Sequence, residues 1–67
     1  MALVENVLKN HEIRTQYIDV IIQSKNGKVL YWGDIENYNF KFQKFEVLEQ
    51  RIMIDKTTLL LQIDFSS

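Results

Sequence analysis

Cysteine and proline are absent from this sequence of 67 residues, and histidine occurs only once. The lack of thiols excludes disulfide bonds and thiolate metal sites. A single histidine also excludes a histidine-rich metal site, so we expect no metal and no other cofactor. Only two glycines are present, and no linker or internal repeat is visible. The sequence therefore predicts one small domain over residues 1–67.

A surplus of charge of one sign is also lacking. Eight basic residues stand against nine acidic ones, for a formal net charge of −1, which argues against the strongly basic surface of a nucleic-acid-binding protein. The apolar stretch at the N-terminus is too short to span a bilayer and carries Glu5, so we expect neither a membrane segment nor a signal peptide. We expect a cytoplasmic protein that binds neither a membrane nor, directly, a nucleic acid.

Apolar residues, by contrast, are plentiful for so short a chain. They make up 46% of it and include four Phe, three Tyr and one Trp. A domain of this size buries only about 60% of the surface that its unfolded chain exposes. Because disulfides and metals are excluded, self-association is the remaining way to stabilise it, and we expect a homodimer.

The first half of the chain predicts a helix followed by a β-hairpin. Residues 2–10 place one apolar stripe on a helical face, formed by Leu3, Val4, Val7 and Leu8. Residues 16–23 alternate as a strand, with an apolar face made of Ile18, Val20 and Ile22. Asn26-Gly27 then predicts a hairpin turn, because both residues tolerate positive φ. Residues 28–33 return as the second strand.

The second half of the chain carries conflicting signals. Residues 34–39 form a polar connection, after which the alternation of Tyr38, Phe40 and Phe42 suggests a strand. A helix over residues 41–50 is the interpretation that we adopt, because three- and four-residue steps relate Phe42, Phe45, Leu48 and Ile52. Residues 51–55 fit either the end of that helix or a fourth strand. Residues 57–65 close the chain as a strand with an inner face of Leu59, Leu61, Ile63 and Phe65.

These elements predict an α+β fold. A three-stranded antiparallel sheet carries an N-terminal helix, and a second helix lies between strands 2 and 3. Such a domain is small enough to favour a dimer.

A catalytic site is not predicted, because the sequence shows no convergent set of polar groups. His11 lies between the first helix and the first strand, and no nucleophile motif accompanies it, so we interpret it as a loop or capping residue. Asp34 and Glu36 are two residues apart in a polar connection, where solvated surface acids are the usual finding. We therefore expect a binding protein and not an enzyme.

Two stretches in the middle of the chain resemble a known family. YIDVIIQSKNGKVLYW (residues 17–32), a polar loop and KFEVLEQ (residues 44–50) are similar in order and spacing to the small uracil-DNA glycosylase inhibitors of podophages that infect Bacillus. The turn glycine Gly27, the preceding Gln23 and Tyr31 match the family, as does the run that begins at Phe45. The sequence departs from the family at Trp32, where an acid is expected, and at Glu49, where a tyrosine is expected.

The resemblance implies a DNA-mimicking protein. Such inhibitors are homodimers that capture the apolar loop side chain of the host glycosylase in a pocket lined by one Phe from each subunit, while acidic groups stand where DNA phosphates would lie. Carried over, Phe45 lines the pocket and Glu46 takes a phosphate-like place. The other partner-binding candidates are Phe42, Leu48, Glu49, Asp34 and Glu36. The resemblance places the protein in the cytoplasm of the host cell, with the host glycosylase as its partner.

Other interpretations of the same residues stay open. Phe45 is equally compatible with packing in the core. Tyr31, Trp32 and Phe45 are dimer-interface candidates, although Tyr31 and Trp32 also fit packing on the sheet. The alternative function is a small dimeric regulatory or assembly protein without inhibitor activity. A binder of single-stranded nucleic acid comes third because of the near-neutral charge, and an enzyme comes last.

Overall fold

The computed structural model describes residues 2–36 and 40–66. Two short helices, α1 (Val4–Leu8) and α2 (His11–Gln16), precede the strands β1 (Asp19–Gln23) and β2 (Val29–Asp34). A single 3-10 turn, η1 (Phe40–Phe42), is followed by β3 (Val47–Ile52) and β4 (Thr58–Ile63). Part of the polar connection expected at residues 34–39 lies outside the described residues.

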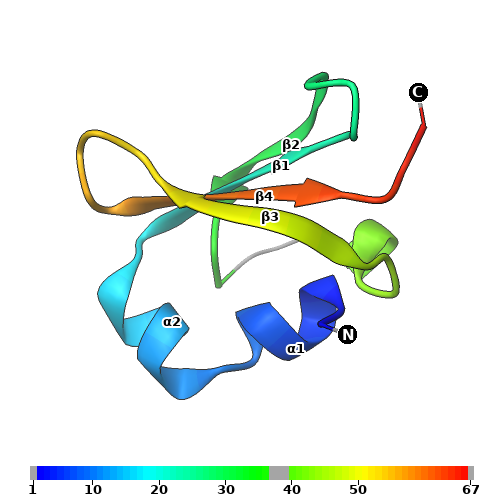
Figure 1. The fold of residues 1–67 in the computed structure, drawn as a ribbon. Helices are drawn as coiled ribbons and strands as arrows, with labels where there is room; N and C mark the ends of the chain where they lie inside the picture. The colour runs from blue at the N-terminus through cyan, green and yellow to red at the C-terminus, as the bar shows by residue number, and fades with distance from the viewer. Residues whose placement is uncertain (1, 37–39, 67) are drawn as a thin grey trace.

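The four strands form one mixed sheet in the order β2-β1-β4-β3. Both outer pairs are antiparallel hairpins, whereas the central strands β1 and β4 run parallel. Both helices lie on the same side of this sheet, so neither helix covers its other side, which we call the open face (Figure 1). The predicted α+β class is confirmed, but the predicted sheet of three antiparallel strands is wrong.

The helical part of the fold divides differently from the prediction. The apolar stripe of the expected first helix is present, because Val4, Val7 and Leu8 are buried in α1. A second helix, α2, follows in place of the expected loop. Asn10 begins it by accepting hydrogen bonds on its side chain from the backbone N–H groups of residues 12 and 13, as a helix N-cap does. His11 is therefore the exposed first residue of α2.

The predicted helix over residues 41–50 is wrong. Only η1 is helical there, and the chain continues as β3. The physical reason is that this segment finds backbone partners elsewhere in the chain: the N–H of Val4 donates to the carbonyl of Phe45 (3.0 Å), and the N–H of Val47 donates to that of Ala2 (2.8 Å). Long-range hydrogen bonds outweigh the few tenths of a kcal/mol per residue by which helix propensities differ. The open alternative for residues 51–55 resolves as the end of β3 at residues 51–52, followed by the turn that leads back into β4.

The core lies between the helices and the inner side of the sheet. The predicted apolar faces of the two central strands are confirmed, since the fully or almost fully buried side chains include Val20, Ile22, Leu59, Leu61 and Ile63. Phe65 is half-buried and packs against the same cluster. Ile18 was expected on this face, but it precedes β1 and is 64% exposed.

Candidate functional site

The side of the sheet that faces away from the helices carries a short apolar row. Pairing register places Trp32, Ile21 and Leu60 next to one another across three strands, and the charged Arg51 follows Leu60 on β3. Ile21 and Leu60 are buried in the middle of this row, although they do not belong to the main core cluster. Trp32 at its β2 end is 69% exposed. The row therefore has a buried centre and an exposed aromatic ring at its β2 end.

Two carboxylates lie beside this row at the end of the first hairpin. Asp19 in β1 is directly opposite Asp34 in β2. Asp34 is two residues beyond Trp32, so strand alternation directs both side chains to the open face. Within residues 2–36 and 40–66, neither aspartate forms an ion pair within 4.0 Å. Like charges directly opposite each other on a sheet are destabilising, so this pair opposes folding unless a cation or a basic partner approaches it.

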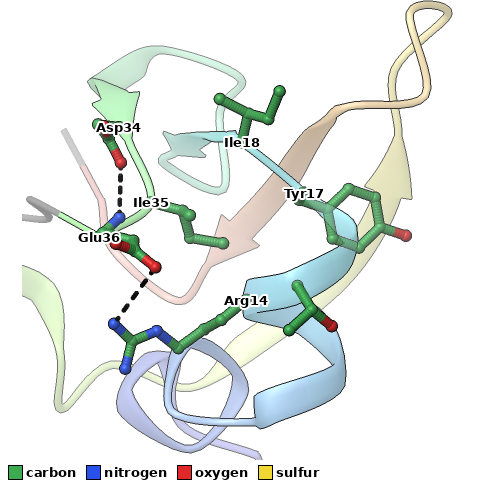
Figure 2. A pocket seen from close by; sticks show the side chains of 7 residues that line it. Arg14, Tyr17, Ile18, Asp34, Ile35 and Glu36 are labelled. Atoms are coloured by element: carbon green, nitrogen blue, oxygen red, sulfur yellow. Dashed lines mark hydrogen bonds and ion pairs between the residues drawn. The ribbon is translucent and has the colours of Figure 1, made fainter.

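A shallow pocket adjoins the same end of β2. It has a volume of about 270 Å³ and is lined by Arg14, Thr15, Tyr17, Ile18, Asp34, Ile35 and Glu36. Figure 2 shows that its wall is held by two polar contacts. Oδ1 of Asp34 accepts the backbone N–H of Glu36 at 2.8 Å, and the guanidinium of Arg14 lies 3.9 Å from the carboxylate of Glu36.

The charged side chains that line the pocket already have polar contacts. Its volume is below the roughly 300–1,000 Å³ typical of small-molecule sites. The carboxylate of Asp34 fixes the end of β2, and that of Glu36 faces a cation from α2. We interpret the pocket as a recess at the rim of the open sheet face, adjoining Ile18.

Phe45, the residue on which the resemblance depends most, packs against its own domain. Its ring is edge-on to that of Phe65, with 5.3 Å between centroids, and 6.0 Å from the ring of Phe42. Phe42 is itself buried. Phe45 is half-buried and touches the main core. Of the two interpretations that the sequence left open, the core position is the one that the structure describes.

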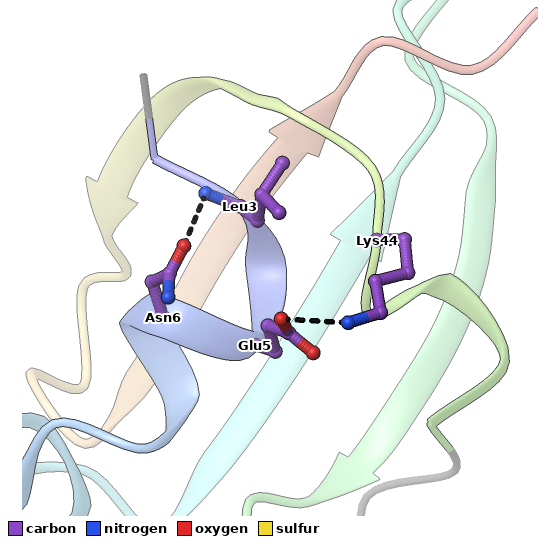
Figure 3. A network of polar contacts seen from close by, with 4 residues as sticks. All are labelled: Leu3, Glu5, Asn6 and Lys44. Carbon is purple, nitrogen blue, oxygen red and sulfur yellow. Dashed lines mark hydrogen bonds and ion pairs between the residues drawn. The ribbon is translucent and has the colours of Figure 1, made fainter.

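Contacts from α1 hold the segment around Phe45 in place (Figure 3). The ammonium group of Lys44 lies 3.0 Å from the carboxylate of Glu5, whose side chain is mostly buried. The N–H of Glu5 donates to the carbonyl of Gln43 at 3.0 Å. Asn6 accepts the N–H of Leu3 at 3.2 Å and so fixes the start of α1. The segment is therefore anchored at several points to the N-terminus.

The remaining predicted site residues fall into separate places. Glu46 is half-buried and bridges to Leu3, whereas Leu48 and Glu49 are exposed on the edge strand β3. Tyr31 lies opposite Ile22 on the core side, where its hydroxyl donates to the carbonyl of Asp34. Trp32 and Asp34 share the open face of β2, and Asp34 and Glu36 line the pocket. Phe42 and Phe45 belong to neither place.

Sequence reasoning missed several residues of the open face and of the adjoining pocket. Asp19 was seen only as part of a strand, although its position opposite Asp34 follows once the hairpin register is known. Ile18 and Arg14 enter the site because α2 ends next to β2. Nothing local in the sequence signals that proximity.

Two searches for particular features of the described chain are negative. Within residues 2–36 and 40–66, no three His, Cys, Asp or Glu side chains are grouped so that they could hold a metal ion. No helix in those same ranges has the length and apolar character needed to cross a membrane.

No known protein family, curated protein or solved structure matches the chain.

Proposed function

We propose that this chain is a non-catalytic protein-binding module whose contact surface is the open face at β2. The exposed Trp32 carries the proposal. Aromatic anchors of this kind dominate the energy of protein interfaces. The Asp19–Asp34 pair next to it supplies negative charge that a basic partner surface would relieve, which favours encounter with such a partner.

The sequence resemblance supplies the specific partner of this proposal, the host uracil-DNA glycosylase. An enzyme that binds DNA presents a basic groove. An acidic pair beside an apolar anchor suits such a groove as a substitute for DNA. In this form of the proposal, Trp32 takes the role that the resemblance gave to Phe45, and Asp19 and Asp34 stand in for phosphates. The protein then acts in the host cytoplasm as an inhibitor of uracil excision.

The test is a uracil-excision assay with purified glycosylase and increasing amounts of this protein. Inhibition is expected for the wild type. Trp32→Thr, which replaces the aromatic with another residue that favours strands, is expected to weaken it about tenfold or more. Asp34→Asn should weaken it mainly at low salt, because charge attraction is screened as salt rises.

Ile54→Thr is the matched control, because Ile54 is 99% exposed on the turn of the other hairpin. It should inhibit as the wild type does. Unchanged excision at a large excess of the wild-type protein would exclude the glycosylase as the partner. Equal inhibition by the wild type and by Trp32→Thr would exclude the Trp32 surface.

A second candidate function is a dimeric regulatory or assembly protein that has no enzyme target. The observation that favours it is the exposed apolar edge of β3, where Leu48 and Ile52 are 49% and 57% exposed. This candidate predicts a dimer in solution and no effect on uracil excision. The same assay, read together with a measurement of molecular mass, separates the two functions.

A further inference from the structure

The outer edge of β3 has a short section without backbone partners among the described residues. At one end, the N-terminal segment covers the edge, because Leu3 bridges to Glu46 and Ala2 accepts the N–H of Val47 at 2.8 Å. At the other end, β3 stops at Ile52. The uncovered section is therefore residues 48–52, and Gln50 lies at its centre.

The alternation of hydrogen-bonded and non-hydrogen-bonded pairs in the β3–β4 hairpin shows which backbone groups of residues 48–52 face outward. The N–H of Met53 donates to the carbonyl of Thr58 at 3.0 Å, and β3 and β4 keep one register from Glu49 to Ile52. Bonded and non-bonded pairs alternate along an antiparallel ladder. The backbone groups of Glu49 and Arg51 are consequently directed at β4. Those of Gln50 and Ile52 are directed away from it.

The side chains of this section are complementary to themselves. Its sequence is Leu48-Glu49-Gln50-Arg51-Ile52. When two copies run antiparallel about Gln50, Glu49 of each copy lies opposite Arg51 of the other. Leu48, where the register of the β3–β4 hairpin shifts at a β-bulge, would face Ile52 of the other copy. Both apolar side chains are about half exposed in the single chain.

We propose that two copies of this chain pair edge to edge through β3, about a twofold axis at Gln50. The inference deepens the homodimer of the second candidate function and rests on it, by stating which surface the two copies share. Gln50 then meets Gln50 of the other copy with both backbone groups facing outward, as a hydrogen-bonded pair requires. The product is a continuous sheet of eight strands with a Trp32 near each end.

Charge selects this register over its neighbours. Centring the axis on Glu49 or on Arg51 would place two like charges directly opposite each other, which destabilises a sheet. Shifting the pairing by one residue would set Glu49 opposite Gln50. A residue whose backbone groups face β4 would then be paired with one whose groups face outward, which an antiparallel ladder does not allow. In the proposed register, Glu49 and Arg51 occupy non-hydrogen-bonded positions, where opposite side chains approach most closely. Their existing 3.0 Å ion pair within one chain then becomes part of a four-charge cluster.

The other edge strand lacks these properties. Asp34 is the only charged residue of β2, so antiparallel pairing of two β2 strands gives no opposite-charge pair. The exposed Trp32 belongs to the open face and not to the β2 edge. The observations therefore favour a second copy as the occupant of the β3 edge, and they leave the open face for another partner.

Sedimentation velocity of the full chain tests the proposal with a charge-reversal pair. The wild type is expected to be a dimer at tens of micromolar concentration. Glu49→Arg gives a strand with two positive charges, and Arg51→Glu gives one with two negative charges. Each variant alone should dissociate about tenfold or more readily than the wild type.

An equimolar mixture of the two variants is the decisive sample. Two arginines on one strand then face two glutamates on the other, so the dimer should return as a heterodimer. Repulsion within a single chain cannot produce this result, because each variant keeps its altered strand in the mixture. Far-UV circular dichroism of each variant checks that the monomer remains folded.

A wild type that stays monomeric at high concentration overturns the proposal. So does a dimer that persists in both single variants, or one that the mixture fails to restore. These outcomes are separate from those of the excision assay. The excision assay depends on Trp32, whereas the sedimentation experiment depends on Glu49 and Arg51, so either proposal can fail while the other stands.

Discussion

The two hairpins of the sheet have the same plan, one inner strand and one edge strand, but their turns are stabilised differently. The turn of the β1–β2 hairpin contains the fully buried Ser24, whose hydroxyl accepts the N–H groups of Asn26 and Lys28 at 3.3 and 3.2 Å. The turn of the β3–β4 hairpin depends on the exposed Asp55, which accepts the N–H groups of Thr57 and Thr58 at 3.0 Å each. One turn is held by a buried neutral group and the other by an exposed charge.

The backbone of the two turns shows the same contrast. Gly27 supplies a positive φ of 88° in the first turn, and Lys56 supplies one of 63° in the second. Glycine adopts this conformation without steric cost, whereas a residue with a Cβ atom does not. The local sequence of the first turn is therefore sufficient to explain its backbone conformation. The second turn instead depends on the contacts of Asp55.

The largest expected effects concern the inner strands, where truncating a buried side chain in either hairpin should lower the free energy of unfolding by the same amount. Ile22→Ala in β1 and Leu61→Ala in β4 each remove a fully buried side chain, and each is expected to lower the free energy of unfolding by about 2–5 kcal/mol. Urea denaturation followed by circular dichroism measures it. A marked difference between the two variants would show that one hairpin contributes more to the core than the other.

A milder pair serves as control, because a domain of this size has roughly 3–10 kcal/mol of total stability and the alanine variants can be largely unfolded. Ile22→Val should cost about 0.5–1.5 kcal/mol. Ile18→Val, at an exposed position just before the same strand, should change stability by less than about 0.5 kcal/mol.

The next effect concerns the buried hydroxyl of the first turn. Ser24→Ala leaves the N–H groups of Asn26 and Lys28 without that acceptor, and it should destabilise the fold by about 1–2 kcal/mol. Thermal unfolding at neutral pH measures the change. The loss should be the same at pH 3.5 and pH 7, since a hydroxyl does not titrate there; a strongly pH-dependent loss would contradict this account of the turn.

A smaller effect is expected from exchanging the residues with positive φ. Gly27→Ala should destabilise the first turn by about 1 kcal/mol. Lys56→Gly should stabilise the second turn by a few tenths of a kcal/mol, because relief of the backbone strain exceeds the added freedom of the unfolded chain only slightly. The two variants should therefore shift the urea midpoint in opposite directions, and a shift in the same direction would refute the comparison.

The smallest effect at neutral pH is that of Asp55→Asn. The hydrogen bond from the N–H of Thr57, followed by that from the Thr58 hydroxyl, lowers the pKa of Asp55 below its ordinary value. A lowered folded-state pKa contributes stability that is present above the ordinary pKa and is lost as the pH falls through the lowered one. The wild type should therefore lose more stability below about pH 4 than Asp55→Asn does.

The measurement is the unfolding temperature of both proteins between pH 7 and pH 2. Their difference isolates Asp55 from the other carboxylates. Parallel curves for the two proteins would show that the second turn does not depend on this charge. Ser24→Ala is the natural companion, because its curve should stay parallel to that of the wild type.

The sequence predicted those parts of the fold that local signals specify. The Asn26-Gly27 turn, the strands on either side of it and the apolar face of β4 are all present. In each, alternation of side chains and the turn residues act within a few neighbouring positions. The candidate site was predicted less completely. Asp34 shares a strand face with Trp32 and a pocket with Glu36, but Phe45 packs on the core, and Asp19 and Ile18 were missed.

The failures share a physical cause. The helical spacing of Phe42, Phe45 and Leu48 is equally compatible with a turn followed by a strand. The turn packs the two Phe rings on the core, and the strand exposes the side chain of Leu48. The choice was made by residues about 40 positions away, because residues 2–5 supply backbone hydrogen bonds and the carboxylate of Glu5 to residues 43–47. A prediction from neighbouring residues cannot include both segments, because they are too far apart in the sequence.

By itself, then, the sequence determined the α+β class, the first hairpin and the apolar faces of the central strands, because these follow from side-chain alternation and turn chemistry. Tertiary structure alone decided that β1 and β4 run parallel, that residues 47–52 form an edge strand, and that Trp32 faces away from the helices. These features depend on which distant segments satisfy each other's backbone hydrogen bonds.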